Sequence, residues 1–143
     1  MKSFLIVDDS STIRMRMKQA IQNASREAAQ FLEAADGETA VTLFEAQKPD
    51  AVFLDLVLPE KPDGNLEGHA GLGILRTMLD ERPGTPIVLV SAFPQEHSDV
   101  VAAISFGAFA HLQKPIKPAD VKRVLDALEP IGAAPNSDRF DYR

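Results

Sequence analysis

The fold is decided by the stretch SFLIVDDSS, residues 3–11. Residues 4–7 are all apolar, which is typical of a strand that is buried on both faces of a sheet. The strand stops at Asp8, and either of the two following serines then offers an N-cap for a helix with apolar residues at helical spacing. The stretch therefore predicts a strand, an acidic turn and a helix.

The same order of strand and helix recurs along the chain. Further strands are expected at residues 30–34, 51–54, 86–90 and 109–113, and helices at about 11–24, 37–47, 72–79, 95–106 and 118–128. Because parallel strands need crossover connections, the helices cover both faces of the sheet. We therefore expect one doubly wound α/β domain over residues 1–128, followed by a flexible tail or the start of a linker over residues 129–143.

The composition of the chain argues against several classes of protein function. The 143 residues include 21 acidic and 15 basic side chains, for a net charge of −6, and no cysteine. The acidic balance argues against direct binding of nucleic acid, and the lack of cysteine excludes disulfides, thiolate metal sites and cysteine nucleophiles. No apolar run approaches the roughly 20 residues of a membrane helix. We expect a cytoplasmic protein that does not bind a membrane.

Acidic and polar residues stand at the ends of four of the expected strands. They are Asp8, Asp9, Asp55, Ser91 and Lys114. The carboxyl ends of parallel strands form one edge, where open α/β sheets bind their ligands. Clustered carboxylates repel unless a cation lies among them; Mg²⁺ prefers carboxylate and phosphate oxygens, and a lysine ammonium suits a phosphoryl group. The sequence therefore predicts a magnesium site that places phosphate on a carboxylate.

These residues and their neighbours resemble the CheY-like receiver domain of two-component response regulators. The matching segments are Ile6–Ser10, Asp36–Glu38, Phe53–Pro59, Val90–Ala92, Phe106–Ala108 and Lys114–Pro115. They occur in the family's order and span residues 3–128, nearly the whole expected domain. The resemblance implies a flavodoxin-like sheet of five parallel strands in the order 2-1-3-4-5, with five helices.

The resemblance also implies a role for each site residue. Asp55 is the expected phosphoacceptor, Lys114 pairs with the phosphate, and Ser91 is the switch hydroxyl. The expected ligands of Mg²⁺ are Asp8, Asp9, Asp55 and the backbone carbonyl of Val57. The phosphoryl group comes from a histidine kinase or a phosphotransfer protein, and the phosphorylated domain binds a downstream protein target. Such a domain is not an enzyme, but it assists its own phosphorylation and dephosphorylation, and its Lys114–Pro115 bond is expected to be cis.

The chain departs from the family in two places. His111 stands at the switch position where the family usually has Tyr or Phe, which adds pH sensitivity. The loop over residues 56–70 is long for a βα connection, and aligning the family's helix start with Gly71 implies an insertion of about eight residues. An alternative alignment at Asp63 moves the extra residues into the helix. We expect the insertion to shape partner choice or to shield the phosphate from water.

The sequence leaves alternatives open. The chain is either a stand-alone receiver or the receiver portion of a longer regulator whose output domain is missing, and the face built from residues 95–106, 109–113 and the last helix offers a surface for a homodimer. A metal-dependent phosphatase of the haloacid dehalogenase type is less favoured, because Val57 stands where that family has a second aspartate. A flavodoxin-like nucleotide-binding protein is weaker still, because no Gly-rich phosphate loop follows the first strand.

Overall fold

The computed structural model describes residues 2–62 and 70–133 of the chain, and the side chains of this part up to residue 129. The strands are β1 (Lys2–Val7), β2 (Ala29–Ala34), β3 (Ala51–Asp55), β4 (Ile87–Ser91) and β5 (Ala110–Gln113). The helices are α1 (Ser11–Ala24), α2 (Gly37–Gln47), α3 (Gly71–Glu81), α4 (Ser98–Phe106) and α5 (Pro118–Ala133). Most of the expected loop insertion, residues 63–69, lies outside the described residues, and so does the tail beyond residue 133.

The five strands form one parallel sheet in the order β2-β1-β3-β4-β5, which confirms the expected fold class. Every residue of β3 and β4 is buried, as continuous apolar runs predict for strands covered on both faces. Strand β2 lies at one edge and only Ala34 in it is fully buried, which explains why its apolar pattern is weak.

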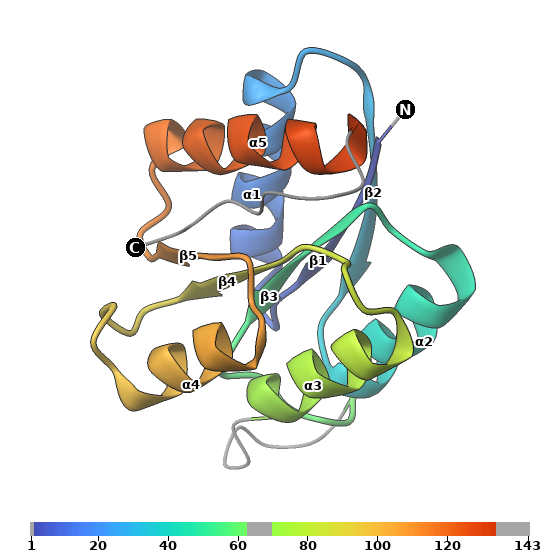
Figure 1. The fold of residues 1–143 in the computed structure, drawn as a ribbon, viewed down its shortest axis with the longest axis vertical. Helices are drawn as coiled ribbons and strands as arrows, with labels where there is room; N and C mark the ends of the chain where they lie inside the picture. The colour runs from blue at the N-terminus through green and yellow to red at the C-terminus, as the bar shows by residue number, and fades with distance from the viewer. Residues whose placement is uncertain (1, 63–69, 134–143) are drawn as a thin grey trace.

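Helices cover both faces of the sheet, with α1 and α5 on one side and α2, α3 and α4 on the other (Figure 1). Successive side chains of β1 enter different layers: Phe4 and Ile6 pack with α1 and α5, whereas Leu5 and Val7 pack against the other helices. Burying each such side chain contributes about 1.5–3 kcal/mol. The two layers hold the sheet rigid, so its carboxyl edge is a fixed platform.

Two helices differ from the expected boundaries. Helix α4 begins at Ser98 rather than near residue 95, because the His97 side chain caps it by accepting a hydrogen bond from the Asp99 N–H at 3.0 Å. Val101 is 55% exposed, because Val100 and Ala103 occupy the buried face of this short helix. Helix α5 continues to Ala133, five residues past the expected end of the last helix.

The described ends of the long loop after β3 are tied to neighbouring helices. The first N–H groups of α2 bind the loop, with Gly37 N donating to the Pro59 carbonyl at 2.9 Å and Glu38 N donating to the Glu60 carbonyl at 2.7 Å. At the other end, Gly71 N donates to the Leu56 carbonyl at 3.2 Å. The start of α3 therefore lies directly on the chain leaving β3, and α3 begins where the alignment at Gly71 placed it.

Replacing Gly71 with alanine is expected to lower the free energy of unfolding by about 1–3 kcal/mol. A Cβ at this position would overlap the backbone of Leu56, which has no free space to move because Leu56 is buried. The matched control is Gly73→Ala in the same helix, where a Cβ meets nothing within 4 Å. The control should raise the free energy of unfolding by roughly 0.5–1 kcal/mol through helix propensity. Urea denaturation measures both, and equal effects would contradict the close approach.

Candidate functional site

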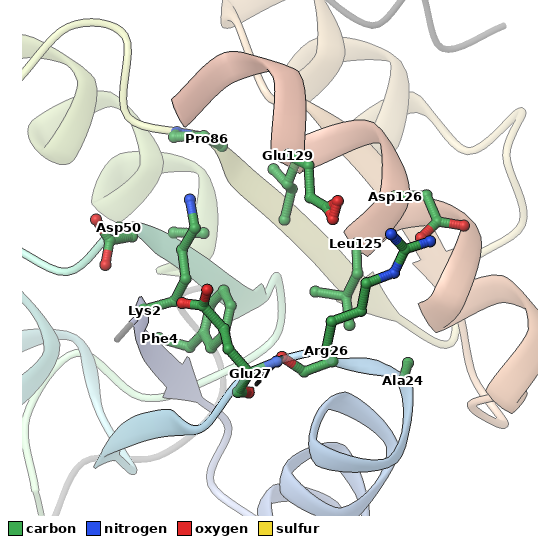
Figure 2. Close-up of a pocket in the computed structure, with 13 residues that line it drawn as sticks. Lys2, Phe4, Ala24, Arg26, Glu27, Asp50, Pro86, Leu125, Asp126 and Glu129 are labelled. Carbon is green, nitrogen blue, oxygen red and sulfur yellow. Dashed lines mark hydrogen bonds between the residues drawn. The ribbon is translucent and has the colours of Figure 1, made fainter. Parts of the chain in front are cut away.

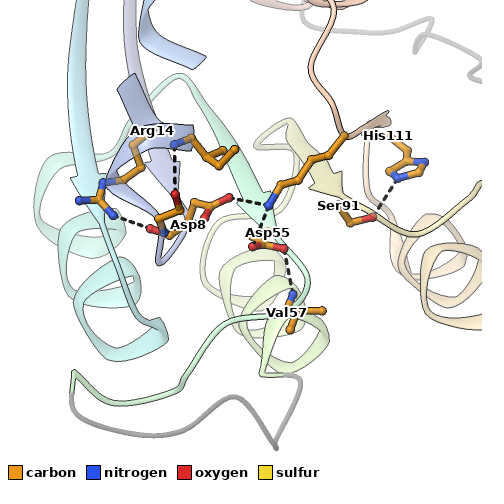
Figure 3. Close-up of polar contacts among 9 residues, drawn as sticks. Asp8, Arg14, Asp55, Val57, Ser91 and His111 are labelled. Atoms are coloured by element: carbon orange, nitrogen blue, oxygen red, sulfur yellow. Dashed lines mark hydrogen bonds and ion pairs between the residues drawn. The ribbon is translucent and has the colours of Figure 1, made fainter. Parts of the chain in front are cut away.

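The predicted site residues meet at the carboxyl edge of the sheet. Asp8 and Asp9 follow β1, Asp55 ends β3, Ser91 ends β4 and Lys114 follows β5. Asp8, Asp9, Asp55 and Lys114 converge, while Ser91 lies on the neighbouring strand, where Asp55 is in register with Val90. Figure 3 shows Asp8, Asp55 and Ser91 at this edge. The lateral order of the strands, with β1 and β3 adjacent, places the two acidic segments side by side.

Asp55 is a buried carboxylate, only 4% exposed, with two hydrogen-bond donors. Val57 N donates to Oδ1 at 3.0 Å and Lys114 Nζ donates to Oδ2 at 3.2 Å. The pKa of Asp55 is raised to about 6, chiefly by burial and in part by the charge of Asp8, while the Val57 N–H and the Lys114 ammonium oppose the rise. The two donors therefore hold the Asp55 carboxylate in place, but they neutralise its negative charge only in part.

Asp8 and Asp9 supply further carboxylate oxygens beside Asp55. Asp8 Oδ1 accepts a hydrogen bond from Ser10 N at 2.9 Å, and its buried Oδ2 forms an ion pair with Lys114 Nζ at 2.9 Å. Asp9 is exposed, and one oxygen from each of the three acids lies within 4.8 Å of the others. Three carboxylates this close together, with one lysine ammonium beside them, fit a hard divalent cation such as Mg²⁺.

Lys114 joins the two buried acids. Burial by itself lowers the pKa of Lys114, but the hydrogen bond to Asp8 and the charge of Asp55 outweigh it and raise the pKa. Its backbone N–H donates to the Ser91 carbonyl at 2.8 Å, and the Lys114–Pro115 bond is cis, as expected. These contacts fix the root of the side chain to β4, so that the ammonium points back to the carboxylates.

The two expected switch residues contact each other. Ser91 Oγ and His111 Nε2 lie 3.1 Å apart, and the residues are 1% and 3% exposed. Burial lowers the pKa of His111, which favours the neutral imidazole. The histidine therefore gives the Ser91 hydroxyl a direct polar link to β5, which a phenylalanine ring would lack.

Arg14 on α1 also contacts the site, although it was not among the residues predicted from the sequence. Its Nη1 donates to the Asp8 backbone carbonyl at 2.6 Å, and its Nε donates to Glu33 on β2 at 2.8 Å. Lys18 also binds Glu33, at 2.7 Å, and these two hydrogen bonds lower the pKa of Glu33. Arg14 thereby ties the acidic turn after β1 to β2. The sequence did contain a signal for this contact: Arg14 and Lys18 are four residues apart, and residues at this spacing share one face of a helix.

The sequence matches the family model of the response regulator receiver domain over residues 4–126. The chain belongs to this family. The receiver is 33% identical to the chemotaxis protein CheY of Thermotoga maritima, a match that covers 91% of the chain and 97% of the relative. It is 30% identical to the regulatory protein PhoP of Bacillus subtilis, which controls alkaline phosphatase synthesis, over 89% of the chain and 48% of that protein.

Solved structures agree with the receiver fold. A receiver domain from Clostridium thermocellum superposes with a TM-score of 0.78 at 20% identity, over 95% of this chain and all of that one. A CheY-like receiver domain from Methanospirillum hungatei has a TM-score of 0.75 at 23% identity, over 93% and 98%. The chain is thus a CheY-like receiver of two-component systems. Within its described residues, every helix is too short or too polar to span a membrane.

Replacing His111 with phenylalanine is expected to weaken the fall in the free energy of unfolding that accompanies a drop in pH below 6.5. Because burial lowers the pKa of His111 below 6.5, the unfolded chain binds a proton that the native receiver does not, and the free energy of unfolding falls as the pH drops below 6.5. Asp55 acts in the opposite sense, since its raised pKa means that its contribution is lost as the pH rises to about 6.

The Asp55 effect is common to the two proteins, so their difference isolates His111. Urea unfolding followed by circular dichroism in steps from pH 5 to pH 8, without divalent cations, measures both profiles. The free energy of unfolding of the wild type should drop relative to the variant toward pH 5. Parallel profiles would show that His111 is not held neutral.

Proposed function

We propose that the chain is a phosphorylation-dependent switch whose phosphoacceptor is Asp55. The observation that carries the proposal is the placement of its buried carboxylate between the Lys114 ammonium, 3.2 Å away, and the oxygens of Asp8 and Asp9. A carboxylate with a raised pKa is still mostly ionised at neutral pH, so it is a nucleophile under physiological conditions.

Asp8, Asp9, Asp55 and the Val57 carbonyl would hold Mg²⁺. When bound, the ion neutralises the oxygens of the phosphoryl group during transfer. The role of the Val57 carbonyl is supported by its position two residues after Asp55, whose Oδ1 already accepts the Val57 N–H. The four oxygens are hard ligands of the kind that magnesium prefers.

The transfer itself is a matter of positioning. A carboxylate oxygen of Asp55 attacks the phosphorus of a phosphohistidine on a histidine kinase or a phosphotransfer protein, the new P–O bond forms, and the P–N bond breaks with its electron pair on the imidazole. Lys114, whose Nζ lies 3.2 Å from the accepting carboxylate, leaves its ion pairs with Asp8 and Asp55 and pairs with an oxygen of the transferred phosphoryl group. The receiver thereby assists its own phosphorylation, and the same groups assist hydrolysis.

The new phosphate would act on Ser91 and His111. About two negative charges at Asp55 attract the Ser91 hydroxyl, and its hydrogen bond to His111 Nε2 then changes. Because His111 lies on β5, the change reaches the face of α4, β5 and α5, where Val101 and Phe106 are 55% and 43% exposed. This face is the proposed surface for a downstream protein target or for a homodimer.

We propose a stand-alone cytoplasmic regulator. The CheY of Thermotoga maritima supports this form, because the match covers 97% of that protein. The alternative, a receiver within a longer regulator, is supported by PhoP of Bacillus subtilis, of which the match covers 48%. In both forms the receiver itself binds protein partners and leaves nucleic acid to other domains, consistent with its net charge of −6.

Intact mass spectrometry after incubation with acetyl phosphate and Mg²⁺ tests the phosphoacceptor. We expect a single phosphate adduct on the wild type and none on Asp55→Asn, because the amide is not a nucleophile. The matched control is Asp80→Asn, an exposed aspartate on α3, which should keep the adduct.

Omitting Mg²⁺ should slow adduct formation at least about tenfold, since the phosphoryl oxygens lose their counter-charge. Continuous phosphate release without an accumulating adduct would favour a metal-dependent phosphatase instead. An adduct that persists in Asp55→Asn would overturn the assignment of the phosphoacceptor.

A further inference from the structure

Arg14 connects the acidic turn after β1 to the neighbouring strand β2. Its Nη1 donates to the Asp8 backbone carbonyl at 2.6 Å, and its Nε donates to the Glu33 carboxylate at 2.8 Å. Figure 3 shows the guanidinium beside Asp8. The arginine side chain is only 16% exposed, so solvent competes little for its hydrogen bond to Asp8. A planar guanidinium that donates in two directions holds its two acceptors in a fixed relation.

The carbonyl that Arg14 binds belongs to the peptide bond between Asp8 and Asp9. Because a peptide group is planar, fixing this carbonyl fixes the direction in which the chain enters Asp9. The rest of the turn is held as well, since Asp8 N donates to the Ala34 carbonyl of β2 at 3.0 Å and Ser10 N donates to Asp8 Oδ1 at 2.9 Å. Arg14 therefore sets the orientation of the peptide group that leads into Asp9.

Asp9 depends on its backbone more than the other two acids of the site do. Asp8 and Asp55 are buried, and both form ion pairs with Lys114. Asp9 is exposed, so the place of its carboxylate follows from the backbone that carries it rather than from packing. One oxygen from each of the three acids lies within 4.8 Å of the others. The turn must keep this spacing against the mutual repulsion of the carboxylates.

The binding of Mg²⁺ is sensitive to such spacing. The ion demands near-octahedral coordination at short distances, about 2.0–2.1 Å. Residues that orient the ligands of a metal without touching it typically change its affinity about 10–100-fold when they are replaced. The bond from Arg14 to the Asp8 carbonyl is a contact of this kind, because it orients the peptide group between two of the expected ligand residues.

We propose that Arg14 is a positioning residue of the magnesium site. It holds the peptide group between Asp8 and Asp9 so that the Asp9 carboxylate stays beside those of Asp8 and Asp55. The Glu33 carboxylate fixes the guanidinium in turn. Because the metal site is part of the proposed function, the inference rests on it, but metal binding is measured without any transfer of a phosphoryl group.

The sign of the effect separates positioning from charge. Removing a positive charge next to a cation site should by itself strengthen metal binding, because one repulsive charge is lost. Removing the bond that orients the turn should weaken metal binding. Arg14→Gln removes both, so weaker binding identifies the orienting role. Arg14→Lys keeps the charge but replaces the planar fork with a single ammonium, so its affinity should fall between those of the wild type and Arg14→Gln.

Two other arginines provide matched controls. Arg16 lies exposed on α1, and Arg26 is exposed just beyond the far end of this helix. Arg26 lines a groove of about 160 Å³ where β1, β3 and β4 begin, together with Phe4 and Leu125 (Figure 2). This groove lies at the opposite end of the strands from Asp55. Arg16→Gln and Arg26→Gln therefore remove the same charge without removing the bond that orients the acidic turn.

Titration of the full chain with Mn²⁺, followed by electron paramagnetic resonance with Mg²⁺ as the competitor, measures the dissociation constants. We expect the dissociation constant of Arg14→Gln for Mg²⁺ to rise at least about tenfold. Those of the two controls should stay within about twofold of the wild type, because salt screens exposed charges. Urea unfolding without divalent cations verifies that each variant is folded. Arg14→Lys decides the question by itself if Arg14→Gln does not fold, since it keeps the charge.

Equal affinities in Arg14→Gln and the two controls would overturn the inference and leave the metal site itself intact. A wild type that binds neither ion would instead overturn the metal site, and the role of Arg14 with it. At saturating Mg²⁺, the rate of adduct formation from acetyl phosphate in Arg14→Gln should return to the wild-type rate, because Arg14 acts through the metal ligands. A rate that stays low at every concentration of Mg²⁺ would contradict this role.

Discussion

Lys114 holds two buried carboxylates together, with its ammonium 2.9 Å from Asp8 and 3.2 Å from Asp55. Removing one partner of a buried ion pair typically costs about 3–5 kcal/mol, because the remaining charge is left without compensation. Burial and the charge of Asp8 raise the pKa of Asp55, and the single ammonium of Lys114 opposes that rise only in part. The edge of the sheet therefore carries a local excess of negative charge that a divalent cation is suited to neutralise.

The pairing of the strands and the hydrogen bonds around this cluster hold the acidic side chains close together despite their repulsion. Lys114 and Asp55 are 59 residues apart in the chain, and only the parallel pairing of β3, β4 and β5 brings them together. Two residues hold the turn at Asp8. The Ser10 N–H donates to the Asp8 side chain, and Arg14 donates to the Asp8 backbone carbonyl. The two apolar core layers stabilise the fold and so offset the unfavourable free energy of placing acidic side chains close together.

The hydrogen bond between Ser91 and His111 would give the proposed switch a polar connection. A hydrogen bond is directional, so a movement of the Ser91 hydroxyl changes the preferred position of the imidazole on β5. A phenylalanine ring at position 111 has no polar atom, so it would move only if a displacement of the Ser91 hydroxyl opened space for it. The imidazole also adds a titratable group to a buried contact, which would link the state of the proposed switch to pH.

Local patterns in the sequence were sufficient for the strands, the fold class and the acidic edge. The apolar run of residues 51–54 predicted a strand buried on both faces, and Asp55 at its end predicted a site, because parallel strands end at the same edge. The start of α4 was predicted wrongly, since its N-cap is the side chain of His97, a residue type seldom used for that purpose.

By itself, the sequence determined the periodicity of each element and the kinds of side chain at the strand ends, because both are properties of neighbouring residues. Only the tertiary structure decided which of those side chains touch. The ion pair of Asp8 with Lys114, the bond from Arg14 to Glu33 and the groove beside Leu125 all depend on residues far apart in the chain. Their distances follow from how helices and strands pack in three dimensions, which spacing along the sequence does not encode.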